Sequence, residues 1–209
     1  AGTLRVKDIR PGPDVGSAPS GLTDVNGTLF FAANDGATGV EVWKSDGTEA
    51  GTQRVKDIMP GLNGSSPNSL VEQGGALFFA AAGFGFGLAP AFSLWKSDGT
   101  EAGTVEVKDV RPTSPVDANG TLLFAGDDGS TGAELWRSDG TEVGTARVKD
   151  IQPGSAGSSL NSPVEVDGTL FFWAIDGAAG FELWRSDGTE AGTVRVRDIR
   201  PGPVGSFPS

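Results

Sequence analysis

Short apolar runs recur along this chain at a steady interval. Each run has neighbouring apolar residues, as at Leu29-Phe30-Phe31, and three similar runs begin at Leu77, Leu122 and Leu170. An unbroken apolar run predicts a strand that is buried on both of its faces. With no helices expected to cover such sheets, we predict small sheets stacked radially against one another.

Each apolar run is the second strand of a predicted β-hairpin. In the first unit, residues 20–25 and 28–33 flank Asn26-Gly27. The equivalent dipeptides are Gly74-Gly75, Asn119-Gly120 and Asp167-Gly168. All four pairs accept the positive φ angles of a two-residue type I′ turn, so the sequence predicts four hairpins.

A third and a fourth strand complete each predicted unit. The third strand carries a tryptophan and leads into Ser-Asp-Gly-Thr, which begins at Ser45, Ser97, Ser138 and Ser186. In this turn the Asp is expected to bond its own backbone two residues on. The fourth strand, predicted over residues 53–58 in the first unit, alternates charged and aliphatic residues, which favours an outer edge.

The repeat sets the fold class. One valine of the repeat recurs at Val6, Val55, Val107, Val148 and Val196, at intervals of 49, 52, 41 and 48 residues. Four strands per period of about 40–50 residues are typical of a propeller blade. We therefore expect an all-β protein, a single β-propeller domain over 1–209 with four-stranded antiparallel blades. Its four units are approximately 10–58, 59–110, 111–151 and 152–199, with 1–9 and 200–209 as overlapping repeat ends.

Two copies of the outer strand compete for one place. The segment from Leu4 to Ile9 matches that from Val194 to Ile199, although the last unit needs one fourth strand only. One copy could be redundant in a closed ring, or the chain could be part of a larger ring. Alternatively, one copy could self-associate with a neighbouring chain by strand addition. We favour the closed ring because an unpaired edge strand promotes aggregation.

Composition narrows the chemistry. The net charge of −11 disfavours nucleic acid as a partner. The chain has no Cys and no His, which removes disulfides, zinc-thiolate sites and the commonest general base. No apolar run reaches the roughly 20 residues that span a bilayer.

The third strand and its turn share the core Glu-Leu-Trp-x-x-Asp-Gly-Thr. It is intact from Glu134 and from Glu182, and nearly so from Glu41 and Leu94. The chain thereby resembles the bacterial ELWxxDGT-repeat proteins over essentially its whole length. The resemblance implies a secreted or surface-associated β-propeller without a defined activity. The blade is also similar in outline to kelch and quinoprotein-type propellers, which carries no function by itself.

Several residues are candidates for sites. One tryptophan recurs in each unit, at Trp43, Trp95, Trp136 and Trp184. These rings could form platforms on which sugars stack, but we expect them to be core residues packed between neighbouring sheets. Four acidic residues at one rim, Asp35, Asp127, Asp128 and Asp176, are weak candidates for a Ca²⁺ site. They lack the dense spacing of a calcium loop, so we expect turn formation and no cofactor.

One loop departs from the repeat. Residues 80–92 are longer, apolar and rich in glycine, and they place Phe84 and Phe86 where the other units have acidic residues. Exposed, these rings would form an interaction patch, and Trp173 is a further residue unique to its unit. We name these three as candidate binding residues and equally consider that the Phe rings fold over the blades.

We predict no catalytic residues and no enzyme. Carboxylates that recur once per unit are expected to serve the blade, whereas catalysis needs a unique constellation. The expected function is a non-enzymatic extracellular or cell-surface propeller that binds a protein or a glycan through its rim loops. A lectin with repeated inter-blade sites is the alternative, and a hydrolase or lyase using scattered carboxylates is the third hypothesis.

Overall fold

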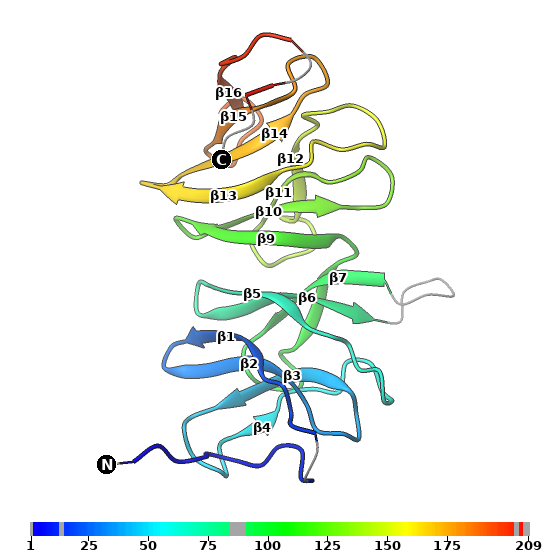
Figure 1. Ribbon diagram of the computed structural model, residues 1–209, viewed down its shortest axis with the longest axis vertical. Coiled ribbons are helices and arrows are strands. Elements are labelled where there is room, and N and C mark those ends of the chain that lie inside the picture. Colours follow the sequence, from blue (N-terminus) through cyan, green and yellow to red (C-terminus); the bar gives the residue numbers. More distant parts are fainter. Residues whose placement is uncertain (1, 13–14, 84–90, 203–204, 207–209) are drawn as a thin grey trace. The chain divides into compact units, whose positions relative to one another are not determined.

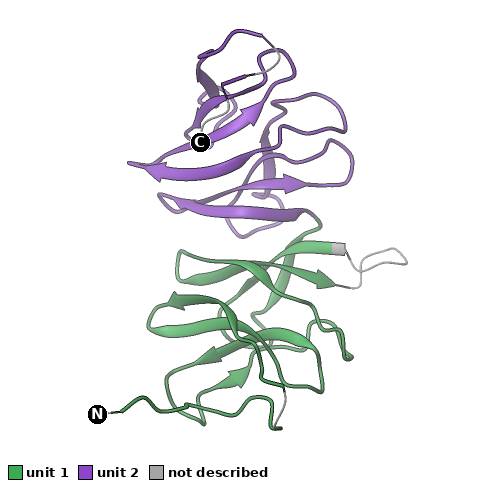
Figure 2. Cartoon of the chain, in the orientation of Figure 1, with its two compact units in different colours: residues 1–109 green, residues 110–209 purple. Residues whose placement is uncertain are grey.

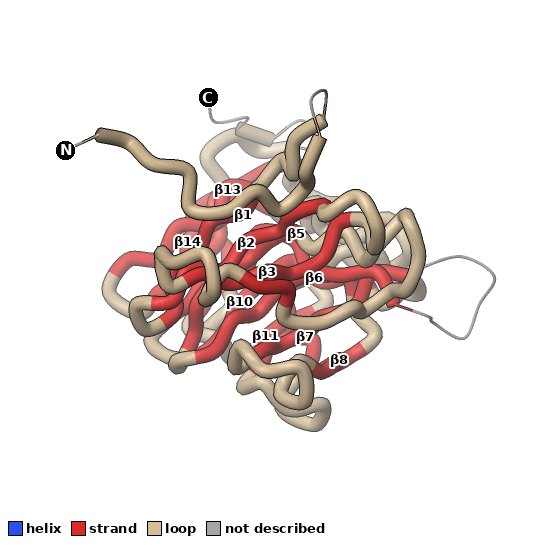
Figure 3. Tube along the Cα trace, turned by 90° about the horizontal axis from the view of Figure 1, so that it is seen from below, coloured by secondary structure: helices blue, strands red, loops and turns tan. Residues whose placement is uncertain are grey.

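All regular secondary structure in the described part of the chain is β-strand (Figure 3). The computed structural model describes residues 2–12, 15–83, 91–202 and 205–206. Its sixteen strands form four sheets, and each sheet contains four strands that are consecutive in the sequence and antiparallel (Figure 1). The predicted fold class, a β-propeller type of four-stranded antiparallel blades, is confirmed.

We number the blades in chain order. Blade 1 contains β1 (Ser20–Val25), β2 (Thr28–Asn34), β3 (Val40–Ser45) and β4 (Gln53–Arg54). Blade 2 contains β5 (Asn68–Gln73), β6 (Ala76–Gly83), β7 (Ala91–Ser97) and β8 (Val105–Lys108). Blade 3 contains β9 (Arg111–Ala118), β10 (Thr121–Asp127), β11 (Glu134–Ser138) and β12 (Ala146–Lys149). Blade 4 contains β13 (Asn161–Val166), β14 (Thr169–Ile175), β15 (Phe181–Ser186) and β16 (Val194–Arg197).

The chain divides into two compact units, each with two blades (Figure 2). Unit 1 is residues 1–109 and contains blades 1 and 2, while unit 2 is residues 110–209 and contains blades 3 and 4. Closure of all four blades into one ring stays a prediction.

The hairpin turns have the backbone that their residues predict. Asn26 and Gly27 have φ angles of 52° and 81°. The other three turn pairs are also positive at both positions. Because a type I′ turn needs positive φ at both central residues, all four predicted hairpins are confirmed.

The outer strands are shorter than predicted. The sequence predicts a strand over residues 53–58, but β4 ends at Arg54; likewise β16 ends at Arg197 instead of Ile199. The cause in blade 4 is a side chain, because the backbone N–H of Ile199 donates to the Glu182 carboxylate rather than to the neighbouring strand. Residues 2–9, predicted to contain a strand, form none because no strand among the described residues pairs with them.

A hydrophobic core fills the space between the two blades of each unit. In unit 1, Phe30 of blade 1 and Phe79 of blade 2 belong to one buried cluster. In unit 2, Leu123 of blade 3 and Phe172 of blade 4 do the same. Phe30 and Phe31 are 2% and 5% exposed, so both faces of β2 are buried as its sequence predicts.

Candidate functional site

Three glutamates are the most deeply buried ionisable groups of the described chain. Glu41, Glu134 and Glu182 occupy the same position on the third strand of blades 1, 3 and 4, and each is 0% exposed. Burying a carboxylate is costly unless hydrogen bonds compensate it. Their partners therefore decide whether these groups are available for chemistry.

The glutamates bind the backbone of the segment that leaves the outer strand. The N–H groups of Ile151 and Gln152 donate to the Glu134 carboxylate at 2.9 and 3.2 Å. In blade 4, Ile199 and Arg200 donate to Glu182 in the same way at 3.0 and 3.4 Å.

In blade 1 the two donors lie further apart in the sequence. Glu41 accepts from the N–H groups of Met59 and Ser65 at 3.1 and 2.9 Å. Burial raises the pKa of Glu41 and of Glu134, although these hydrogen bonds act in the opposite direction. Because backbone donors occupy the carboxylates, the glutamates fasten the segments that leave the outer strands of blades 1, 3 and 4.

The Ser-Asp-Gly-Thr turn is closed by its own side chains in every blade. In blade 3, the Ser138 and Thr145 hydroxyls lie 2.7 Å apart, and Asp139 Oδ1 accepts from the N–H of Thr141 at 2.8 Å. The hydrogen bonds from Thr48, Thr100 and Thr189 lower the pKa of the equivalent carboxyls of Asp46, Asp98 and Asp187. These serines therefore face a threonine hydroxyl rather than a base.

The repeated tryptophans are buried in all four blades. Trp43, Trp95, Trp136 and Trp184 are between 6% and 9% exposed. Trp95 and Trp184 belong to the inter-blade clusters of their units. Such buried rings offer no open face for a sugar to stack on.

The four acidic rim residues are engaged in their own loops. Asp35 accepts from the N–H groups of Ala37 and Thr38, and although burial raises its pKa, those hydrogen bonds lower it overall. The remaining carboxylates accept hydrogen bonds from residues two or three positions on, namely Asp127 from Gly129, Asp128 from Ser130 and Asp176 from Ala178. Within the described ranges no three acidic side chains gather as a metal site. The expectation of turn formation without a cofactor, with Ca²⁺ as the weaker alternative at these residues, stays a prediction.

The other candidate binding residues are Phe84, Phe86 and Trp173. Phe84 and Phe86 lie outside the described residues. Trp173 is half-buried in β14, where it is paired with Leu183 of β15.

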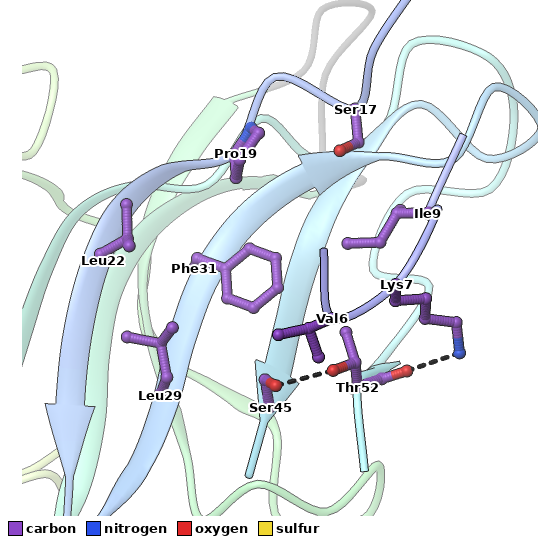
Figure 4. A pocket seen from close by; sticks show the side chains of 10 residues that line it. All are labelled: Val6, Lys7, Ile9, Ser17, Pro19, Leu22, Leu29, Phe31, Ser45 and Thr52. Atoms are coloured by element: carbon purple, nitrogen blue, oxygen red, sulfur yellow. Dashed lines mark hydrogen bonds between the residues drawn. The ribbon is translucent and has the colours of Figure 1, made fainter. Parts of the chain in front are cut away.

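An apolar pocket of about 220 Å³ lies on blade 1, beneath the N-terminal segment (Figure 4). Its ten lining residues are Val6, Lys7, Ile9, Ser17, Pro19, Leu22, Leu29, Phe31, Ser45 and Thr52. Lys7 Nζ donates to the Thr52 carbonyl at 2.7 Å, and Ser45 and Thr52 share a hydrogen bond of 2.7 Å. These polar groups are thus bonded to one another, and the lining residues offer no nucleophile with an adjacent base.

Sequence reasoning missed two features. It assigned no role to Glu41, Glu134 and Glu182, and it did not anticipate that Lys7 binds the first blade. The glutamates could have been noticed, because blade 2 has Ser93 at their position and also the shortest connection to the next blade.

Comparison with known proteins identifies the fold rather than a family. No family model and no curated protein matches the chain. The solved structure of puromycin hydrolase matches with a TM-score of 0.57 and 17% identity, over 88% of this chain and 31% of that one. Its serine-to-alanine mutant complexed with PGG matches with a TM-score of 0.54 and 13% identity, over 98% of this chain and 43% of that one. A puromycin-hydrolyzing peptidase of Mycobacterium tuberculosis has a TM-score of 0.54 and 14% identity, over 92% and 31%.

These matches correct the functional prediction. We expected a non-enzymatic binding or scaffolding propeller, or else a lectin, but the three solved structures named above, which share the fold over 88 to 98% of this chain, are of hydrolases. The prediction was wrong because it considered only reacting groups within the blades. The chain spans less than half of those hydrolases, so repetition within the blades does not argue against an enzyme.

Proposed function

We propose that this chain is the propeller part of a larger hydrolase. In this proposal the blades form a rigid framework, and the reacting groups belong to residues outside the blades. The likeness of fold to puromycin hydrolases, which extends over 88 to 98% of this chain but 31 to 43% of theirs, supports the proposal.

The main observation behind the proposal is that the buried polar groups of the blades are already hydrogen-bonded to one another or to the backbone. The three buried glutamates accept from backbone N–H groups, and the repeated serine hydroxyls pair with threonine hydroxyls. A catalytic serine needs a base within hydrogen-bond reach, and a catalytic acid needs a free proton position. Because the blade groups are already engaged, they suit a framework better than a reaction centre.

The charge of the chain is consistent with a cationic substrate. A net charge of −11 creates a negative potential around the blades, which attracts cations and repels anions. We therefore propose a small amide or peptide with a free amino group as the substrate class, and no nucleic acid as a partner.

The test is hydrolysis of puromycin and of aminoacyl-p-nitroanilides. We expect no turnover by the 209-residue chain alone and turnover by the natural polypeptide that contains it. Turnover by the isolated chain would place the reacting groups within it and contradict the framework role. A natural polypeptide that contains the chain but hydrolyses neither substrate would contradict the hydrolase assignment.

Two further expectations remain predictions. Membership of the ELWxxDGT-repeat family, and with it export to the bacterial surface, derives from the repeated motif alone. Among the described residues no helix is long and apolar enough to cross a membrane.

A further inference from the structure

The chain contains eight Asp-Gly pairs, because its turns repeatedly need a glycine after an aspartate. Such a pair has a chemical cost. The backbone nitrogen of the glycine can attack the carboxyl carbon of the preceding aspartate, and glycine hinders this attack least because it has no Cβ. The local structure of each pair therefore decides where the backbone is chemically stable.

In seven of the eight pairs the glycine N–H donates to a side-chain oxygen that lies just before it in the sequence. In the four Ser-Asp-Gly-Thr turns the acceptor is the serine hydroxyl, at 3.0 to 3.1 Å. In the hairpin turn of blade 4 the N–H of Gly168 donates to the Glu165 carboxylate. The other two of the seven pairs lie in the rim loops between the second and third strands.

The rim loops of blades 1, 3 and 4 differ in the residue before the pair. In blade 1 the N–H of Gly36 donates to Asn34 Oδ1 at 2.7 Å. In blade 3 the N–H of Gly129 donates to Asp127 Oδ1 at 2.8 Å. In blade 4 this position is Ile175, whose aliphatic side chain cannot accept a hydrogen bond. The acceptor that two loops supply is thus replaced by a methyl-bearing chain in the third.

In other respects the three rim loops are alike. The aspartate of each pair accepts, through Oδ1, from the N–H two residues further on at 2.8 to 3.0 Å. These donors are Ala37, Ser130 and Ala178. Such a bond folds the carboxylate over the Asp-Gly peptide. The glycine of each loop is also exposed to solvent, so the carboxyl group and water are equally available in all three.

The hydrogen bond from the glycine acts on the reacting atom itself. To attack the carboxyl carbon, the amide nitrogen must give up its proton and turn toward that carbon. An oxygen that accepts from this N–H stabilises the protonated nitrogen and fixes its direction. Attack then requires this hydrogen bond to break, which raises the barrier of the reaction.

We propose that Asp176-Gly177 is the site at which this chain isomerises its own backbone. The Gly177 nitrogen forms a bond to Asp176 Cγ, its proton passes to solvent, and the carboxyl group loses its hydroxyl oxygen as water. The product is a five-membered succinimide. Water then adds to either carbonyl carbon of this ring and breaks one of its two C–N bonds. Aspartate or isoaspartate results, with no net change in mass and no oxidation or reduction.

Isoaspartate would release this loop from the outer strand of its blade. Asp176 Oδ2 pairs with Arg195 of β16 at 2.9 Å, while Oδ1 accepts from Ala178 and Ala179. Isoaspartate adds a methylene group to the main chain and shortens the side chain to the carboxylate, so these bonds cannot all be kept. The rim loop of blade 1 pairs with Arg54 in the same way at 3.6 Å, so both loops have the ion pair.

The test is ageing of the folded chain at a constant temperature below its unfolding transition. Proteolytic digestion and liquid chromatography with mass spectrometry then separate isoaspartyl peptides from their parents of equal mass, whereas deamidation of asparagine raises the mass. We expect the peptide with Asp176 to isomerise about fivefold faster than those with Asp35 and Asp128, as the loss of one hydrogen bond implies. Equal or slower isomerisation at Asp176, or none at any Asp-Gly pair, would overturn the proposal.

Two exchanges between the loops test the cause. Ile175→Asn gives blade 4 the residue of blade 1, and should slow isomerisation of Asp176 about fivefold. Asn34→Ile makes the converse change, and should accelerate isomerisation of Asp35 by a similar factor. Ile175→Val, which keeps an aliphatic side chain, is the matched control and should age like the unmodified chain.

The two exchanges lie in different units, so one remains informative if the other fails to fold. Circular dichroism before ageing shows whether each variant keeps its β-sheet. A folded Ile175→Asn that isomerises at the unmodified rate would contradict the proposal. So would a folded Asn34→Ile whose Asp35 stays as slow as before, or a change in Ile175→Val as large as that in Ile175→Asn.

Discussion

Blades 2 and 3 have the same sheet, but the connections that leave them differ. Both contain four antiparallel strands, a buried tryptophan and a Ser-Asp-Gly-Thr turn with a hydroxyl pair of 2.7 Å. However, Ser93 in blade 2 stands where blade 3 has Glu134. Two residues separate β8 from β9, whereas eleven separate β12 from β13. The carboxylate therefore accompanies the long connection rather than the sheet.

This difference separates two kinds of repeated position within one chain. Groups present in all four blades, such as Trp95 and Trp184, build the core that each blade shares with its neighbour in the same unit. Groups present in three blades, such as Glu134, fasten the connection to the next segment. A buried carboxylate would ordinarily be a candidate for acid-base catalysis. Here, however, the glutamate is present in the blades that are followed by a long segment and absent from blade 2, which is followed by a short one.

The largest expected effect concerns what the two blades share. Trp95→Ala and Trp136→Ala each empty a buried aromatic site, so each should lower the free energy of unfolding by about 3–5 kcal/mol. Chemical denaturation of the two variants measures this. A near-neutral result for either one would mean that its ring does not contribute to the core, and unequal costs would break the parallel between the blades.

A smaller effect should distinguish the blades. Glu134→Ala leaves the buried N–H groups of Ile151 and Gln152 without their acceptor, at a cost of about 1–3 kcal/mol. Ser93→Ala at the equivalent position should cost less than half as much, because no long connection depends on it. Denaturation of both variants tests this, and equal costs would contradict the assigned role of Glu134.

The pH dependence of stability should also distinguish Glu134 from the features that all blades share. Burial raises the pKa of Glu134 above its ordinary value of 4.5, so its contribution is greatest below that value and is lost as the pH rises through the raised pKa. We expect the free energy of unfolding of the unmodified chain, relative to that of Glu134→Gln, to decrease as the pH rises through the raised pKa. Urea denaturation of both proteins at several pH values measures the difference, and a constant difference would contradict the expectation.

The Asp carboxyls of the turns act in the opposite direction. Because the pKa values of Asp98 and Asp187 are lowered in the fold, their contribution is present above the unfolded pKa and is lost as the pH falls through the lowered one. Acid unfolding should thus depend on the turns that all blades share. Because the unmodified chain and Glu134→Gln contain the same Asp turns, the contribution of these turns cancels in the difference between the two proteins, which leaves the effect of the glutamate.

The smallest expected effect again concerns a shared feature. Ser97→Ala and Ser138→Ala each remove one hydroxyl of a buried pair, at a cost of about 1 kcal/mol. Thermal denaturation should show similar shifts for both variants. A clearly larger shift in blade 3 would mean that the turn, as well as the connection, differs between the two blades.

Much of each blade could be predicted because its determinants are local. Asn26-Gly27 specifies its turn by its own φ preferences, and the adjacent Phe30 and Phe31 specify a strand buried on both faces. The outer strand was predicted too long because its end depends on a distant residue. Val148 and Lys149 remain in the ladder, but the chain leaves it where Ile151 turns to Glu134.

The candidate sites were less predictable for the same reason. For Asp35 the sequence favoured turn formation over metal binding, and the folded loop shows which N–H groups its carboxylate accepts from, namely those of Ala37 and Thr38. Lys7 gave no local signal at all, since its partners Glu49 and Thr52 lie more than forty residues away. Contacts between repeats cannot be read from the pattern within one repeat.

The exchange rate of the Ile151 backbone amide tests the central claim most directly, namely that the buried carboxylates fasten the connections. In the unmodified protein this N–H donates to Glu134 at 2.9 Å and should exchange slowly with solvent. In Glu134→Ala we expect its protection to fall strongly, while the amide of Phe124 in the adjacent strand β10 remains protected. Protection of Ile151 that is unchanged by the substitution would contradict the account.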